Sequence, residues 1–169
     1  MSNKLVDLAK TTIEAYIKER RIIDPPEALP LELKEKAGVF VSIHKKGELR
    51  GCIGTFQPTK PNIGYEIIAN AIEASTRDPR FPPITQEEIP NLEISVDVLT
   101  KPEPVGDIKQ LDPKKYGIIV SSGGRRGLLL PDLEGVDTPA QQIEICRRKA
   151  WIGDDDEITI ERFQVRRYH

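Results

Sequence analysis

The stretch LRGCIGTF at residues 49–56 decides much of this fold, because two glycines flank a cysteine inside an otherwise apolar segment. Glycine in a strand gives up backbone entropy and offers no side chain for packing. The pattern therefore predicts a strand whose backbone is approached closely by another group. The cysteine, Cys52, is one of two in the chain, and Arg50 lies two residues before it.

The segment that precedes this stretch is predicted to pair with it as a hairpin. Residues 38–43 and 49–56 flank Lys45-Lys46-Gly47, the length of a three-residue loop with glycine in the left-handed position. In that register His44 lies opposite Glu48, and Cys52 lies opposite Phe40. The alternation then places Val41, Ile43, Leu49 and Ile53 on one face, with Phe40, Ser42, His44, Arg50 and Cys52 on the other.

Three further segments have the spacing of apolar residues that is typical of amphipathic helices. They run from about residue 5 to 20, from Pro61 to Arg77, and from about Pro139 to Trp151. The third begins with a threonine cap, a first-turn proline and a capping-box glutamine. Three prolines in residues 22–36 predict a stiff, extended connection there rather than a domain linker.

The remaining apolar segments predict strands. Residues 92–98 alternate with period two, and residues 117–121 and 127–130 are apolar runs joined by a short glycine-rich loop. One or two strands close the chain after residue 157. Helices and strands in mixed order indicate an α+β fold with a mixed or antiparallel sheet and about three main helices. We expect one domain over residues 1–169, with two lobes packed as one compact unit or two interleaved subdomains.

Composition narrows the classes of function. Lys and Arg number 25 against 27 Asp and Glu, so the net charge of −2 argues against broad binding to nucleic acid or anionic membrane. The four Phe, four Tyr and one Trp do not alternate with basic residues as a base-stacking surface needs. No run reaches the roughly 18 apolar residues of a membrane span, and no apolar secretory segment is visible. The sequence predicts a cytoplasmic protein.

Metal and cofactor ligands are scarce. The two cysteines are far apart without zinc-ligand spacing, and His44 and His169 are the only histidines. In a reducing compartment the cysteines are predicted to be free thiols. We expect no metal site and no cofactor.

Cys52 has two interpretations. It is a nucleophile or redox thiol if a neighbouring cation, Arg50 or Arg80, lowers its pKa. It is a small packing residue if it is buried, as free cysteines often are. The predicted register puts His44 roughly 13 Å from Cys52 along the strands, which argues against a Cys–His dyad. Cys146 lies on the apolar stripe of the last helix and is predicted to be structural.

The charged residues near this strand also have alternatives. Arg50 is predicted either to bind a carboxylate or phosphate through two contacts, or to form an ion pair with Asp78 or Asp97. Asp78-Pro79-Arg80-Phe81 is either the edge of a groove or a helix stop followed by a turn.

Two features of the second half invite an anion-binding interpretation. The run GGRRG at residues 123–127 has the glycines and arginines that suit a phosphate, but it lacks P-loop spacing and favours a hairpin turn. Lys149 complements the dipole at a helix end. Asp154-Asp155-Asp156 is predicted to be a solvated turn, since calcium-loop spacing is absent.

Four blocks in order carry a resemblance to the AMMECR1 family: residues 49–56, Asp78-Pro79-Arg80-Phe81 with Pro83, residues 126–131, and Cys146 with residues 148–150. Trp151 departs from the pattern, since many relatives would have glycine there. The resemblance implies a two-lobed α+β fold, with the strand at 49–56 near a groove between the lobes. It also implies Memo-like and radical-SAM proteins as partners.

Three hypotheses for function follow. The first is a binding or accessory module that uses a groove around residues 49–56 and works with the partners that the resemblance implies. The second is a thiol-dependent small-molecule enzyme, and the third is a regulator that acts on nucleic acid. The absence of a convincing general base favours the first. The predicted catalytic residue is Cys52, and the residues predicted to bind a small anionic ligand are Arg50, Gly51, Gly54, Thr55, Asp78, Arg80, Phe81, Arg126 and Lys149.

Overall fold

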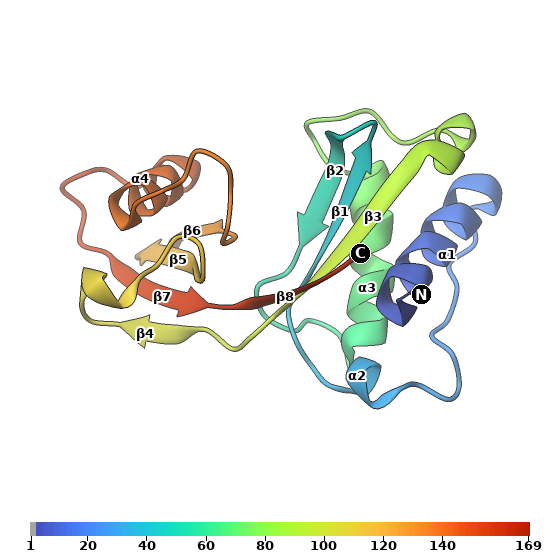
Figure 1. The fold of residues 1–169 in the computed structure, drawn as a ribbon, viewed down its shortest axis with the longest axis horizontal. Coiled ribbons are helices and arrows are strands. Elements are labelled where there is room, and N and C mark those ends of the chain that lie inside the picture. Colours follow the sequence, from blue (N-terminus) through green and yellow to red (C-terminus); the bar gives the residue numbers. More distant parts are fainter. Residues whose placement is uncertain (1–2) are drawn as a thin grey trace. The chain divides into compact units, whose positions relative to one another are not determined.

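A computed structural model describes residues 3–169, and the chain divides into two compact units (Figure 1). The first unit comprises the chain through Leu99 together with Arg166–His169, and the second unit comprises Thr100–Val165. Each unit has its own four-stranded sheet and its own apolar core. Together with three main helices, these sheets confirm the predicted α+β class. The single domain over residues 1–169 stays a prediction.

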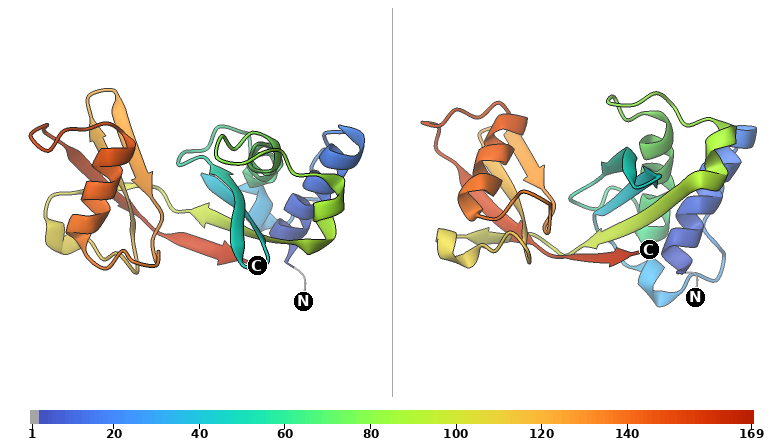
Figure 2. Two further views of the ribbon diagram at one scale, coloured as in Figure 1. Left: turned by 90° about the horizontal axis from the view of Figure 1, so that it is seen from above. Right: turned by 45° about the horizontal axis from the view of Figure 1, so that its top comes forward.

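The sheet of the first unit has the strand order β2-β1-β3-β8. Helices α1 and α3 pack on one face of it (Figures 1 and 2). Val41 and Ile43 of β1 and Val96 of β3 point into the core between the helices and the sheet. The elements are α1 (Lys4–Glu19), α2 (Leu31–Lys34), β1 (Val39–Lys45), β2 (Glu48–Gly54), α3 (Ile63–Thr76), β3 (Leu92–Leu99) and β8 (Val165–Tyr168).

Side-chain caps mark the starts of α1 and α3. The side chain of Asn3 accepts a hydrogen bond from the Leu5 amide, and that of Asn62 accepts one from the Tyr65 amide. Each cap satisfies an N–H that the first turn leaves without a partner. The predicted helix over residues 5–20 is confirmed. The predicted start of the second helix at Pro61 is wrong. The helix begins at Ile63, because Asn62 supplies the N-cap and Pro61 lies before it.

The hairpin of β1 and β2 forms, but its predicted register is wrong. The turn contains two residues, Lys46 and Gly47, with φ of 52° and 79°. Ser42 pairs with Cys52, and His44 pairs with Leu49. A bulge between Ile43 and His44 shifts the register. The shorter turn and the bulge together explain why neither the predicted partner of His44 nor that of Cys52 is found.

The connection over residues 22–36 is extended only in part. It contains the single turn α2, from which Leu33 enters the core with 2% exposure. A 3-10 turn, Gln86–Asn91, precedes β3, and the sequence did not predict it. Within residues 3–169 no helix is long and apolar enough to cross a membrane.

The sheet of the second unit has the order β4-β7-β5-β6, with α4 packed on β5 and β6. The predicted capping box is present: Thr138 accepts from the Gln141 amide, and Gln141 reaches back to the Thr138 amide. The predicted second hairpin is also present, with Gly123-Gly124 as its turn. The elements are β4 (Glu103–Val105), which was not predicted, a 3-10 turn (Ile108–Gln110), β5 (Gly117–Ser122), β6 (Arg125–Leu129), α4 (Pro139–Lys149) and β7 (Thr159–Phe163).

Candidate functional site

The face of the first sheet that is turned away from α1 and α3 carries most of the predicted site, and we call it the open face. Since Val39, Val41 and Ile43 point into the core, the alternate residues of β1 point to the open face. Ser42 stands at its middle, between Cys52 of β2 and Ser95 of β3. Small polar side chains therefore form the centre of this face.

The two glycines of β2 are required by the protein itself. A Cβ on Gly51 would lie closer than 3.0 Å to the carbonyl oxygen of Ala74 in α3. A Cβ on Gly54 would meet the ring of Phe40, its partner across β1. The sequence correctly predicts a close approach to the backbone. The approaching groups are a helix and an aromatic ring, so these glycines are not in themselves signs of a ligand.

Arg50 lies at the bulge of β2 and is held by Glu88. Its Nε donates to Glu88 Oε1 over 3.0 Å, and its Nη1 donates to the Pro82 carbonyl over 2.8 Å. Both side chains are about 85% buried, at 14% and 15% exposure. The hydrogen bond from Arg50 is the main cause that lowers the pKa of Glu88 to about 2. The predicted pairing of Arg50 with Asp78 or Asp97 is wrong, since those two acids pair elsewhere.

Asp78 and Arg80 form a fixed pair just after α3. The Asp78 side chain is only 2% exposed, and it accepts from Arg80 Nε over 3.0 Å and from Arg80 Nη2 over 2.8 Å. It also accepts from the Cys52 amide over 3.0 Å. These donors, with the Arg80 side chain first, hold the pKa of Asp78 well below its ordinary value of 3.8.

The guanidinium of Arg80 faces outward while its position is fixed. Its side chain is 56% exposed, its Nη2 also donates to the Cys52 carbonyl, and it lies 5.4 Å from the ring centre of Phe81. Among the side chains that the structure describes, none accepts a hydrogen bond from its Nη1, which leaves two N–H donors available. The structure thus brings Cys52, Asp78, Arg80 and Phe81 together.

The surroundings of Cys52 raise the pKa of its thiol. It is half-buried and lies 3.2 Å from the hydroxyl of Ser42. Burial raises its pKa above the ordinary 9.0, and this outweighs the opposing effects of Ser42 and Arg80. His44 points to the same face, but it lies two residues beyond Ser42, the partner of Cys52. That is about 7 Å further along β1 at the rise of a strand. Arg80 does lower the pKa of Cys52, as the sequence predicts for a neighbouring cation, but burial raises it by more.

Thr55 belongs to a buried polar cluster beneath the end of β2. Its hydroxyl donates over 3.0 Å to Glu66, a carboxylate with 0% exposure. Glu66 also accepts from the amide and hydroxyl of Thr59 and from the amide of Lys60, and Asn70 donates to Thr55 and to the Val39 carbonyl. Sequence reasoning missed Glu66. The sequence offers one signal for it: Glu66 and Asn70 are polar residues four positions apart on the apolar side of α3.

The predicted binding residues of the second half have local partners. Arg126 Nε donates to the Ser121 hydroxyl over 3.3 Å, and Lys149 Nζ donates to the Leu128 carbonyl over 2.6 Å. Both lie in the second unit, whereas the open face belongs to the first. Cys146 is fully buried and burial raises its pKa to about 12, which confirms its structural role. Among the side chains that the structure describes, no three acidic, His or Cys residues are arranged to hold a metal ion.

Comparisons with known proteins agree with the fold. A protein of Thermotoga maritima is 54% identical over 166 residues, with 96% of this chain and 95% of the relative covered. A protein of Clostridium acetobutylicum is 47% identical over 96% of this chain, which spans only 35% of that relative. The crystal structure of an uncharacterised protein from Pyrococcus horikoshii is 35% identical, covers 96% of this chain and 88% of its own, and has a TM-score of 0.86.

A family model matches residues 6–168, which is nearly the whole described chain. The four blocks that suggested the resemblance all lie inside this match. The chain therefore belongs to the AMMECR1 family.

Proposed function

We propose that this chain is a binding or accessory module and that the open face around Ser42, Cys52 and Arg80 is its binding surface. The observation that carries the proposal is the Arg80 guanidinium, which buried Asp78 fixes in place while more than half of the side chain stays exposed. A group that is fixed before binding loses little entropy on binding. Arg80 is therefore suited to receive a ligand.

The chemistry of this surface selects a small anionic group. The planar fork of arginine matches a carboxylate or phosphate, and Nη1 supplies two donors that make no hydrogen bond within the part of the chain that the structure describes. Phe81 lies against the same guanidinium, and Ser42 and Ser95 provide hydroxyls in the adjacent strands. Arg50 is not part of this surface, because Glu88 and two carbonyls take up its donors.

The Clostridium relative supports an accessory role. This chain matches only 35% of that protein, so a chain of this kind occurs there together with a larger additional part. The Memo-like and radical-SAM partners follow from the family resemblance. The proposal is that the open face binds an anionic ligand, or an acidic side chain, that such a partner presents.

The two alternatives have less support. A thiol enzyme needs a thiolate, and the raised pKa of Cys52 keeps its thiol protonated near neutral pH. A nucleic-acid regulator needs a basic surface, whereas the chain has a net charge of −2.

An NMR titration tests the binding surface directly. Inorganic phosphate and acetate are added to the labelled protein while the Arg80 Nε–H and Cys52 amide signals are followed. We expect saturable shifts of both signals, lost in Arg80→Gln. Arg77→Gln is the matched control, because Arg77 is an exposed arginine three residues away that pairs with Glu73. Shifts that persist in Arg80→Gln, or no shifts at all, overturn the proposal.

The thiol alternative is tested by alkylation of Cys52 in a Cys146→Ser background. We expect the rate to rise only as the pH passes the ordinary thiol pKa, because burial disfavours the thiolate. Rapid alkylation near pH 6 that is lost in Arg80→Gln would instead establish an activated nucleophile.

A further inference from the structure

Trp151 occupies a place in the second unit where its side chain adds nothing to the core. It is 86% exposed, and its backbone is left-handed with φ of 58°. It directly follows the C-cap of α4, where the Ile152 amide bonds the Arg147 carbonyl over 2.8 Å and the Trp151 amide bonds that of Arg148. This pair of bonds marks the helix ending whose left-handed residue is normally glycine. The tryptophan therefore costs backbone energy and gains no burial.

The segment that presents Trp151 is well fixed. We call residues 151–157 the Trp151 loop. Arg125 donates to the Trp151 carbonyl over 2.6 Å and pairs with Asp156 over 3.1 Å. Asp156 also accepts from the Gly153 amide over 2.8 Å, and Ile152 enters the core with 5% exposure. An aromatic side chain on a fixed turn pays little to bind, which is typical of interface hot spots.

The exposed charge of this loop is acidic. The neighbouring basic side chains are engaged locally, since Arg147 donates to the carbonyls of Gly153 and Asp156, and Arg148 pairs with Glu144. The exposed charged side chains that follow Trp151 are Asp154, Asp155 and Glu157. The loop thus offers an indole beside a cluster of carboxylates.

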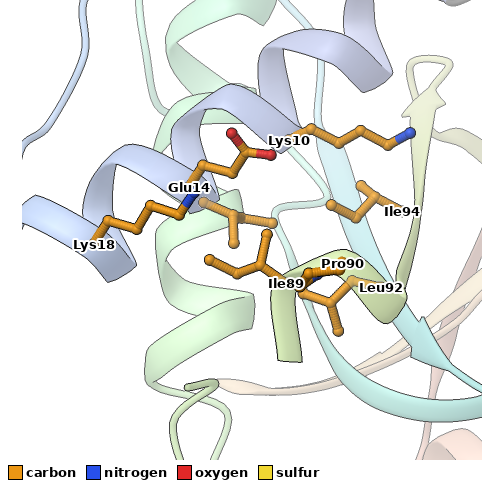
Figure 3. A pocket seen from close by; sticks show the side chains of 8 residues that line it. Lys10, Glu14, Lys18, Ile89, Pro90, Leu92 and Ile94 are labelled. Atoms are coloured by element: carbon orange, nitrogen blue, oxygen red, sulfur yellow. The ribbon is translucent and has the colours of Figure 1, made fainter. Parts of the chain in front are cut away.

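The first unit has a groove between α1 and β3 that the 3-10 turn Gln86–Asn91 also lines (Figure 3). Its volume is about 320 Å³, at the lower end of the range for ligand pockets. Lys10 and Lys18 stand on the α1 side of the groove with Glu14 between them, as Figure 3 shows. Five apolar side chains line it: Ile89, Pro90 and Leu92 are accessible, whereas Ile13 and Ile94 are buried at its base.

We propose that the Trp151 loop of one copy docks into the α1–β3 groove of a second copy. The indole covers the apolar lining, and Asp154 and Asp155 face Lys10 and Lys18. The second copy is the occupant because the chain itself carries both halves of the contact: accessible apolar side chains for the indole, and two lysines, on either side of Glu14, for the carboxylates. The inference goes beyond the proposed function and uses none of the open-face residues.

The single tryptophan of the chain reports this contact without a label. Its emission is recorded over about a hundredfold range of protein concentration, alongside sedimentation velocity, since self-association follows mass action. We expect a blue shift as concentration rises, together with an increase in sedimenting mass. An emission maximum that is independent of concentration overturns the proposal.

Charge reversal identifies the groove. Lys10→Glu with Lys18→Glu is expected to raise the concentration needed for half-association at least about tenfold. Lys4→Glu is the matched control, because Lys4 is an exposed lysine of the same helix outside the groove. Adding Asp154→Lys and Asp155→Lys to the groove variant is expected to restore association. Equal losses with Lys4→Glu, or association that persists in Trp151→Gly, refute the contact.

Discussion

The two units meet the same packing requirement with the same residue. In the first, Gly51 of β2 lies beneath the Ala74 carbonyl of α3, and in the second, Gly127 of β6 lies beneath the Cys146 carbonyl of α4. A Cβ at either glycine would lie closer than 3.0 Å to helix backbone. Both helices therefore rest directly on a strand at one point.

The units differ in what stands beside that point. In the first unit the neighbouring residue, Cys52, points to the open face. Its amide donates to Asp78, and its carbonyl accepts from Arg80. In the second unit the cysteine is the helix residue itself, and it is fully buried. Gly51 of the LRGCIGTF stretch therefore reports helix packing, as Gly127 does, whereas Gly54 makes room for the Phe40 ring and the proposed binding surface lies on the opposite face of the strand from Gly51.

The largest effect on stability is expected from substitutions that disrupt this shared packing of helix on strand. Gly51→Ala and Gly127→Ala are each expected to lower the free energy of unfolding by about 3 kcal/mol, because a helix backbone must move to admit the methyl group. Urea unfolding measures both. Gly124→Ala is the control, since a Cβ there meets nothing within 4 Å. A loss below about 0.5 kcal/mol at either glycine would show that helix and strand are not in direct contact there.

What the sequence predicts well is local. The start of α4 is specified by Thr138, Pro139 and Gln141 within four residues, and the structure has that capping box. The register of the first hairpin is not local, because the bulge places Arg50 against Glu88, a carboxylate 38 residues away. No pattern within the hairpin reveals that partner. A register inferred from alternation alone therefore fails at that point.

The candidate site shows the same division. Short motifs point to Cys52, Asp78 and Arg80, and the structure brings these residues together through hydrogen bonds. The partner of Thr55 was not found, because Glu66 sits on the buried side of a helix, where a carboxylate is expected only if several donors meet it. That condition is tertiary and is invisible in one segment of sequence.

A smaller loss of stability is expected when the pair of Asp78 and Arg80 is weakened, and it can be compared with the pair of Asp156 and Arg125. Asp78→Asn is expected to cost about 2 kcal/mol at pH 7, because it weakens charge-assisted bonds to Arg80 and to the Cys52 amide. The folded-state pKa of Asp78 lies below its ordinary 3.8, so the carboxylate stabilises the fold fully above about pH 5. That contribution is lost as the pH falls from there through the folded-state pKa. The stability difference between wild type and variant should therefore shrink on acidification.

Asp156→Asn in the second unit provides the contrast. Asp156 pairs with Arg125, but both side chains are 41–50% exposed, so solvent screens the pair. Chemical unfolding at pH 7 and pH 3 should show a clearly smaller loss for Asp156→Asn than for Asp78→Asn. Equal losses would mean that burial of Asp78 is not what gives the first pair its strength.

The smallest expected effect compares the left-handed residues at the ends of two helices. Arg20 after α1 and Trp151 after α4 have φ of 53° and 58°. Arg20 gains a contact with the Tyr16 ring, 5.3 Å away, whereas the Trp151 side chain is 86% exposed. Trp151→Gly should therefore raise the free energy of unfolding by about 0.5 kcal/mol, since glycine relieves the left-handed strain but adds entropy to the unfolded chain. Arg20→Gly should gain less or nothing.

Thermal unfolding of dilute protein measures both without the contribution of self-association. A loss of stability in Trp151→Gly would show that the indole serves its own unit, and would remove the reason to seek its contact in a second copy.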